Sequence, residues 1–145
     1  MRRALVILAW LVAGFLPATA LAAGIADVPV RDARSVRAVI QAQLAAFAAD
    51  DARRAFSYAT PKLREMFGSA DRFIEVVREA YPAVYHHETV AFLKPELADG
   101  VLLQGVHLTD ADGVLWLALY RMERQRDRSW RISACQLLPG QGRVA

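Results

Sequence analysis

The chain of 145 residues is poor in cysteine and lysine: it has one cysteine, Cys135, and two lysines, Lys62 and Lys94. A single thiol cannot close an internal disulfide, so the fold must be held by its apolar core. No histidine lies within two residues of Cys135 in the sequence. We therefore interpret this thiol as a small, semi-buried strand residue and not as a nucleophile.

Long apolar runs are absent except at the start of the chain. Arg2 and Arg3 precede the uncharged apolar run over residues 4–16, which is followed by a proline and small residues. This arrangement predicts a cleavable secretory signal over residues 1–23. The alternative, an uncleaved membrane anchor, needs about 20 apolar residues, a length approached only by counting to Ala23. We expect the mature domain to be periplasmic or secreted, with no stable membrane span after cleavage.

An excess of positive charge is also absent from the mature chain. The whole sequence has 18 Lys+Arg and 15 Asp+Glu, and loss of Arg2 and Arg3 leaves 16 and 15, a formal charge of +1. This balance predicts no nucleic-acid partner. Arginines do gather on the last predicted hairpin, and we interpret them as a solvated tip, with anionic lipid or an acidic partner as the alternative. They are Arg121, Arg124, Arg126, Arg128 and Arg131.

Helical patterns are present in the first half of the mature chain and strand patterns in the second. Four predicted helices begin at residues able to cap them, which are Asp32, Asp50 or Asp51, Thr60 and Ser69, and the first helix runs to about Ala49. The predicted strands cover residues 84–93, 101–109, 114–125 and 130–138. Helices followed by an antiparallel meander define an α+β fold. We expect one domain over residues 34–138, with a lead-in at 24–33 and a tail at 139–145.

Two sets of residues resemble known families. The first is similar to nuclear transport factor 2-like domains: Ile40, Gln43-Leu44, Ala46-Phe47, Asp50-Asp51, Ala55-Phe56 and the closing Trp130-Arg131-Ile132. The second resembles the domain of unknown function 4864 family: Phe67-Gly68, the run from Phe73 to Val77 with Tyr81-Pro82, Gln104-Gly105-Val106 and Tyr120-Arg121-Met122-Glu123.

The resemblance covers about residues 34–138 and implies helices packed on a curved, four-stranded antiparallel sheet that forms a cone. The narrower family has no established activity to transfer. The wider superfamily includes isomerases, dehydratases, carriers and dimerisation modules, so the fold alone selects no function.

Strand pairing predicts which side chains share the face toward the helices. If the turn at residues 110–113 ends in a bulge at Gly113, Gln104 faces Tyr120. Continuing across the last hairpin puts Gln136 on the same face, and Gln43 falls within the apolar stripe of the first helix. The predicted pocket residues are Gln43, Gln104, Trp116, Tyr120 and Gln136. They either line a cavity for a small ligand or satisfy one another in the core.

The sequence predicts no catalytic residue, metal or cofactor. Neutral amides orient ligands but cannot act as general bases, and we find no acidic residue on the predicted inner face. His86 and Glu88 share a strand face that His107 could approach as a zinc set, although solvated edge-strand residues explain them more simply. We therefore expect a binding module for a small apolar or amphipathic ligand or a protein partner. The alternatives are a lyase or isomerase of the ketosteroid-isomerase type and a dimerising adaptor module.

The third predicted strand is apolar on both faces. If the helices cover the face of Trp116, then Leu115, Leu117 and Leu119 lie on the other face, flanked by Leu103 and Leu137. Such a patch is rarely left to water, and a second copy packed sheet to sheet would cover it. We therefore expect a homodimer, with coverage by residues 24–31 or by the C-terminal tail as the alternative.

Overall fold

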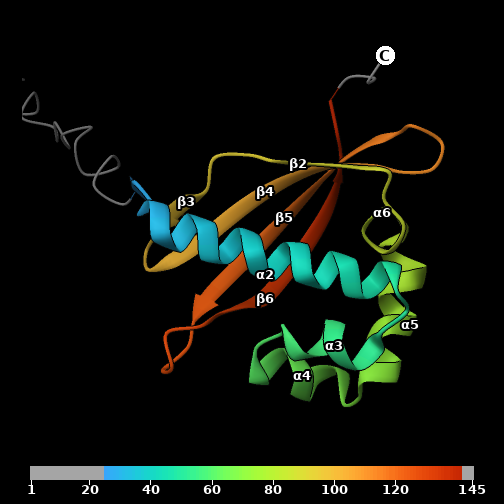
Figure 1. Ribbon diagram of the computed structural model, residues 1–145, viewed down its shortest axis with the longest axis horizontal. Coiled ribbons are helices and arrows are strands. Elements are labelled where there is room, and N and C mark those ends of the chain that lie inside the picture. Colours follow the sequence, from blue (N-terminus) through green and yellow to red (C-terminus); the bar gives the residue numbers. More distant parts are fainter. Residues whose placement is uncertain (1–24, 142–145) are drawn as a thin grey trace, which may run out of the picture.

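A computed structural model describes residues 25–141 (Figure 1). The predicted signal peptide and the last four residues of the predicted tail lie outside the described residues. The helices are α2 (Val30–Ala48), α3 (Ala52–Ser57), α4 (Pro61–Phe67), α5 (Ala70–Ala80) and α6 (Pro82–Tyr85). The strands are β1 (Ile25–Ala26), β2 (Thr89–Phe92), β3 (Glu96–Ala98), β4 (Val101–Thr109), β5 (Leu115–Arg124) and β6 (Trp130–Pro139). No helix in this part of the chain is long and apolar enough to cross a membrane.

Helix α2 is the long predicted helix, and it lies across one face of the sheet (Figure 1). Its stripe of Val36, Ile40, Leu44 and Phe47 is buried, as an apolar repeat of three and four residues requires. The helix begins two residues earlier than predicted. Pro29 occupies the capping position, and Asp32 lies in the first turn, where a carboxylate favours the helix dipole without capping it.

The three predicted caps of the following helices are confirmed. In each case a side-chain oxygen accepts a hydrogen bond from the backbone N–H three residues later, which satisfies one otherwise unpaired donor of the first turn. The caps are Asp51 for α3, Thr60 for α4 and Ser69 for α5. Helix α4 ends at Gly68, whose φ of 83° lies in the left-handed region.

The α+β order is confirmed, but the sheet has more strands than the four predicted. Its hydrogen-bonded path passes through five strands in the order β1-β3-β4-β5-β6, and β2 also pairs with β4. All pairs are antiparallel. The predicted strand over residues 84–93 is wrong in its first part, because Pro82 starts the short helix α6 and only residues 89–92 form β2.

The register confirms one half of the predicted pairing and corrects the other. Gln104 pairs with Tyr120 as predicted, and Gly113, with a φ of 75°, follows the turn between β4 and β5. Between β5 and β6 the register shifts by one residue near Arg121 and Met122, so Tyr120 pairs with Cys135 and not with Ala134. The extra residue on β6 is a β-bulge, and the Ser133 hydroxyl donates to the Arg121 carbonyl at 3.1 Å beside it.

The bulge reverses the predicted orientation of the end of β6. Because side chains alternate along a strand, one extra residue moves every later side chain to the other face. Cys135 and Leu137 therefore pack against the core, whereas Gln136 is exposed on the outer face. The predictions that Gln136 points toward the helices and that Leu137 flanks the outer leucines are wrong for this reason.

We predict that the α2 stripe supplies a large part of the stability. Ile40 is fully buried against the sheet, so Ile40→Ala leaves a cavity and should lower the free energy of unfolding by about 2–5 kcal/mol. Val30 on the same helix is 73% exposed, and Val30→Ala should change it by less than about 0.5 kcal/mol. Urea denaturation of both variants measures the difference. Equal losses in the two variants would contradict the assignment of this core.

Candidate functional site

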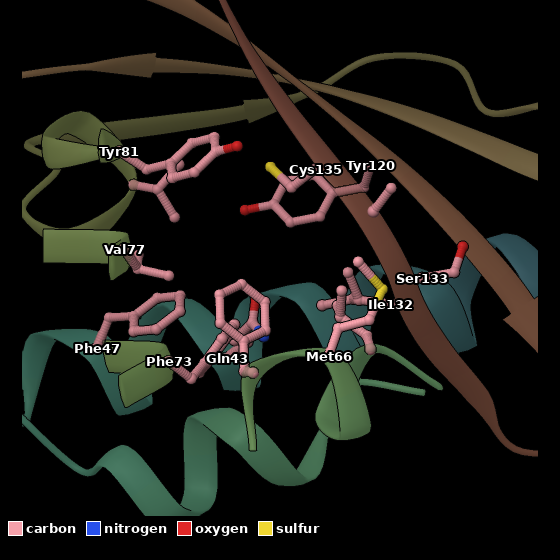
Figure 2. A pocket seen from close by; sticks show the side chains of 14 residues that line it. Gln43, Phe47, Met66, Phe73, Val77, Tyr81, Tyr120, Ile132, Ser133 and Cys135 are labelled. Carbon is pink, nitrogen blue, oxygen red and sulfur yellow. The ribbon is translucent and has the colours of Figure 1, made fainter. Parts of the chain in front are cut away.

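A pocket of about 270 Å³ lies between the helices and the last two strands (Figure 2). Helices α2, α4, α5 and α6 supply one side of it, and β5 and β6 supply the other. The pocket forms because β6 is the edge strand and is covered along only part of its length. The segment before α4 pairs with β6 at Ile132, through Thr60 N–H to the Ile132 carbonyl (2.9 Å) and Ile132 N–H to the Tyr58 carbonyl (2.8 Å).

The pocket wall is mostly apolar. Phe73 is the centre of an aromatic cluster, with ring centroids 5.8 Å from Phe47, 5.4 Å from Phe56 and 5.1 Å from Phe67. Three of these rings line the pocket, together with the aliphatic side chains Leu63, Met66, Val77, Val84, Ile132 and Ala134. Rings packed in tilted and edge-on arrangements form a stiff wall. The pocket is therefore suited to an apolar guest.

Tyr120 is the unusual member of this wall. Its side chain is fully buried and points from β5 into the pocket (Figure 2). The hydroxyl is buried and has no hydrogen-bond partner within residues 25–141. A buried hydroxyl without a partner costs on the order of 1–3 kcal/mol, so such groups are rare in folded proteins. The hydroxyl is thus available to a polar atom brought into the pocket.

Cys135 lies beside Tyr120, because the two residues are directly paired between β5 and β6. Burial raises the pKa of the Cys135 thiol to about 12, a rise that the Tyr120 hydroxyl partly offsets. Burial also raises the pKa of the Tyr120 phenol well above its ordinary value, and the neighbouring thiol adds to this shift. The thiol makes no hydrogen bond to the Tyr120 hydroxyl, so it does not satisfy the phenol. Both groups stay neutral at physiological pH.

Gln43 is the second predicted pocket residue found in the wall. It is only 3% exposed on α2, and its Nε2 donates to the backbone carbonyl of Ala55 at 3.1 Å. This bond ties α2 to α3 and fixes the amide at the inner end of the site. Gln43 therefore combines a structural bond with a position in the pocket wall.

The structure places the other three predicted residues outside this pocket. Gln104 is buried on the inner face, where its Nε2 donates to the carbonyls of Leu93 (2.7 Å) and Gly105 (2.8 Å) and holds the β2–β3 connection. The Trp116 indole donates to Asp110 at 3.0 Å, and this bond lowers the pKa of that carboxyl. Gln136 is exposed on the opposite face. The amides predicted to gather in one cavity therefore do not meet.

The pocket wall contains no carboxylate or imidazole that could serve as the general base of the isomerase alternative. Its fourteen lining residues include no aspartate, glutamate, histidine, lysine or arginine. A ketosteroid-isomerase type of reaction requires such a group within reach of the substrate. The zinc alternative has no geometric support either, since no group of three metal-binding side chains gathers anywhere in residues 25–141.

The outer leucines are partly covered by the chain itself. Leu115, Leu117 and Leu119 are all of intermediate exposure. A Cβ added to Gly105 would lie 2.9 Å from the Leu93 side chain and 3.6 Å from Leu117, so Leu93 packs over that part of the sheet. Gly140 continues the pairing of β6 with β5, because its N–H donates to the Leu115 carbonyl at 2.8 Å.

Sequence reasoning missed the contributions of Cys135, Ser133 and Tyr81 to the pocket. The sequence signal for Cys135 is ambiguous. Ala134 and Leu138 continue the alternation from Ile132, whereas Cys135 and Leu137 have the opposite parity, so the bulge follows only from the observed register. Tyr81 could not be found from the sequence either, because it lies between two helices and its position depends on how they pack.

The fold and the pocket define a class: an antiparallel sheet covered by helices, with an apolar pocket into which the buried, unpartnered hydroxyl of Tyr120 points. The family model described as "Domain of unknown function (DUF4864)" matches residues 30–145. The chain belongs to this family. Comparisons with curated proteins and with solved structures found no match.

We predict that Tyr120→Phe makes the ligand-free protein more stable. The variant removes a buried hydroxyl that has no partner, so the free energy of unfolding should rise by about 1 kcal/mol. Tyr85→Phe is the matched control, because the buried Tyr85 hydroxyl donates to Asp50 and accepts from Arg78, and its loss should be destabilising. Thermal and urea denaturation measure both changes. A destabilised Tyr120→Phe variant would show that the hydroxyl is satisfied.

Proposed function

We propose that this protein is a non-catalytic binding module for a small, largely apolar molecule that carries one neutral hydrogen-bonding atom. The observation that carries the proposal is the buried Tyr120 hydroxyl, which has no partner in the described part of the chain and lies in an apolar pocket. A ligand with a carbonyl, ester or hydroxyl oxygen would satisfy it. Specific ligand sites commonly combine apolar walls with a few placed polar groups in this way.

The volume supports a compact guest. An apolar cavity of about 150 Å³ holds benzene, so a pocket of about 270 Å³ accommodates a ring with a short chain or a flexible chain of similar bulk. The inner end of such a ligand should be neutral. The wall has no cation to pair with a buried carboxylate, and an unpaired buried charge costs far more than an unpaired hydroxyl.

We further infer a nuclear transport factor 2-like cone and an exported protein. A long helix lying across a twisted antiparallel sheet supports the first inference (Figure 1). The second rests on the signal pattern of residues 1–23. A binding module in the periplasm would meet apolar metabolites and lipid fragments, which agrees with the character of the pocket.

We predict that wild-type protein binds butyrophenone more tightly than butylbenzene. The two probes differ chiefly by one carbonyl, which can accept a hydrogen bond from Tyr120, and one such bond corresponds to an affinity gain of about three- to tenfold. Tyr120→Phe should bind the two probes equally. Tyr58→Phe should keep the preference, because its hydroxyl lies outside the pocket and accepts from Arg54. Isothermal titration calorimetry measures the six affinities, two probes for each of the three proteins.

A second variant tests the pocket independently of the hydrogen bond. Val77 points into the pocket and is 7% exposed, so Val77→Phe should fill part of the space and weaken both probes (Figure 2). Failure of both probes to bind the wild type, or unchanged binding to Val77→Phe, would overturn the proposal. Native mass spectrometry of purified protein adds a direct search for a carried ligand.

We also propose a homodimer through the outer face of the sheet, favoured by the partly exposed row of Leu115, Leu117 and Leu119. A protein partner on this face would define the adaptor alternative. We predict that wild type sediments as a dimer at micromolar concentration and that Leu119→Lys sediments as a monomer. Val114→Lys is the control, since Val114 lies before β5 and is 49% exposed. A monomeric wild type in analytical ultracentrifugation would contradict the dimer.

A further inference from the structure

A second hollow adjoins the apolar pocket where β6 bulges. The two share four lining residues, Leu63, Met66, Ser133 and Ala134. The second hollow adds Thr60 and three charged side chains, Lys62, Arg121 and Glu123. Charge that is absent from the pocket wall is therefore present directly beside it. The shared residues make the two hollows direct neighbours.

The bulge on β6 explains why Arg121, whose side chain lies on the outer face of the sheet, lines the second hollow. Arg121 lies on β5, opposite Ala134, and its strand neighbours Tyr120 and Met122 point to the inner face. Ala134 is small and exposed at the sheet edge, so it places no bulk between Arg121 and the hollow. Lys62 lies on α4, on the other side of the same hollow. The two cations thus flank the rim of the pocket from the sheet and from the helix.

These cations are not used by the fold. Three ion pairs occur within residues 25–141, between Arg78 and Asp50, Lys94 and Asp27, and Arg124 and Asp32. None involves Lys62, Arg121 or Glu123, and both Lys62 and Arg121 are exposed. With Glu123 counted, the hollow still has one net positive charge. An anion there would meet two donors that no described carboxylate occupies.

We propose that this hollow is the site for an anionic head group, so that the ligand is an amphiphile with its apolar part in the pocket and a carboxylate or phosphate at Lys62 and Arg121. This inference rests on the proposed apolar binding function and names the chemical class of its ligand. The neutral oxygen that pairs with Tyr120 then belongs to the buried part of the molecule. The charged end stays in water, where the lack of cations in the pocket wall imposes no cost.

The boundary between the pocket and the second hollow suits an alkyl chain that enters the pocket from the hollow. Met66 is 73% exposed although it lines both the pocket and the hollow. Methionine is flexible and adapts to guests of irregular shape. An apolar side chain held at the surface between a charged hollow and an apolar pocket matches the junction between the head and the tail of an amphiphile.

The test compares decanol, decanoate and decyl phosphate in calorimetric titrations at neutral pH and low salt. These probes share one alkyl chain and differ in the charge of the head. Two exposed charge contacts predict that decanoate binds about three- to tenfold more tightly than decanol. A comparison of the affinities for decyl phosphate and decanoate shows whether the site prefers a phosphate or a carboxylate head group. Added salt should reduce the advantage of the anions and leave decanol unchanged.

Variants of the two cations test whether Lys62 and Arg121 cause the tighter binding of the anionic probes. Lys62→Gln and Arg121→Gln should each reduce the affinity for the anions about threefold and leave decanol unchanged. Arg126→Gln is the matched control, because Arg126 is an exposed arginine that does not line the hollow. It removes the same charge from the same hairpin region. An equal effect in this control would show that only net charge matters and would overturn the site.

The outcomes separate the two proposals. Decanol that binds as tightly as both anions overturns the head-group site and leaves the apolar binding function standing. Failure of all three probes to bind overturns both proposals. Tighter binding of an anion that is lost in Lys62→Gln and Arg121→Gln, but kept in Arg126→Gln, supports the head-group site. Tighter binding that is kept in all variants contradicts it.

Discussion

The one-residue bulge on the edge strand β6 determines both the pocket and its rim. Without it, alternation from Ile132 would turn Ala134 and Gln136 inward and Cys135 outward. With it, Cys135 pairs with Tyr120 on the inner face and Gln136 points away. The bulge also shifts the pairing of β5 with β6 by one residue beside Arg121, which lines the neighbouring hollow. Its Ser133 hydroxyl bonds to the Arg121 carbonyl, which satisfies one backbone acceptor at the irregularity.

Much of the fold could be read from the sequence because its signals are local. Helix caps at Asp51, Thr60 and Ser69 each depend on a side chain and a backbone N–H three residues away. The pairing of Gln104 with Tyr120 followed from one turn ending at Gly113. Local signals were misleading at Val84, since a β-branched residue favours a strand but the preceding Pro82 starts a helical turn.

The site was less predictable because it depends on packing between distant elements. The sequence placed Gln43 and Tyr120 correctly on inward faces, yet their position beside one pocket depends on α4 and α5, which the strand pattern does not address. Gln104 shows the limit of reasoning from polarity alone. A buried amide demands partners, but the backbone carbonyls of Leu93 and Gly105 satisfy this one, so structural hydrogen bonds alone explain its burial.

Two buried tyrosines of this domain, Tyr85 and Tyr120, differ in whether their hydroxyls are hydrogen-bonded. The Tyr85 hydroxyl is engaged by Asp50 and Arg78 and ties the end of α2 to α5, so its burial is matched by hydrogen bonds. Tyr120 is as deeply buried, but its hydroxyl has no partner in the described chain, so it lowers the stability of the fold by an amount that phenylalanine would avoid. Under the proposed binding function, a ligand would supply the acceptor that the Tyr120 hydroxyl lacks. The same hydroxyl would then raise the affinity for the ligand although it lowers the stability of the ligand-free protein.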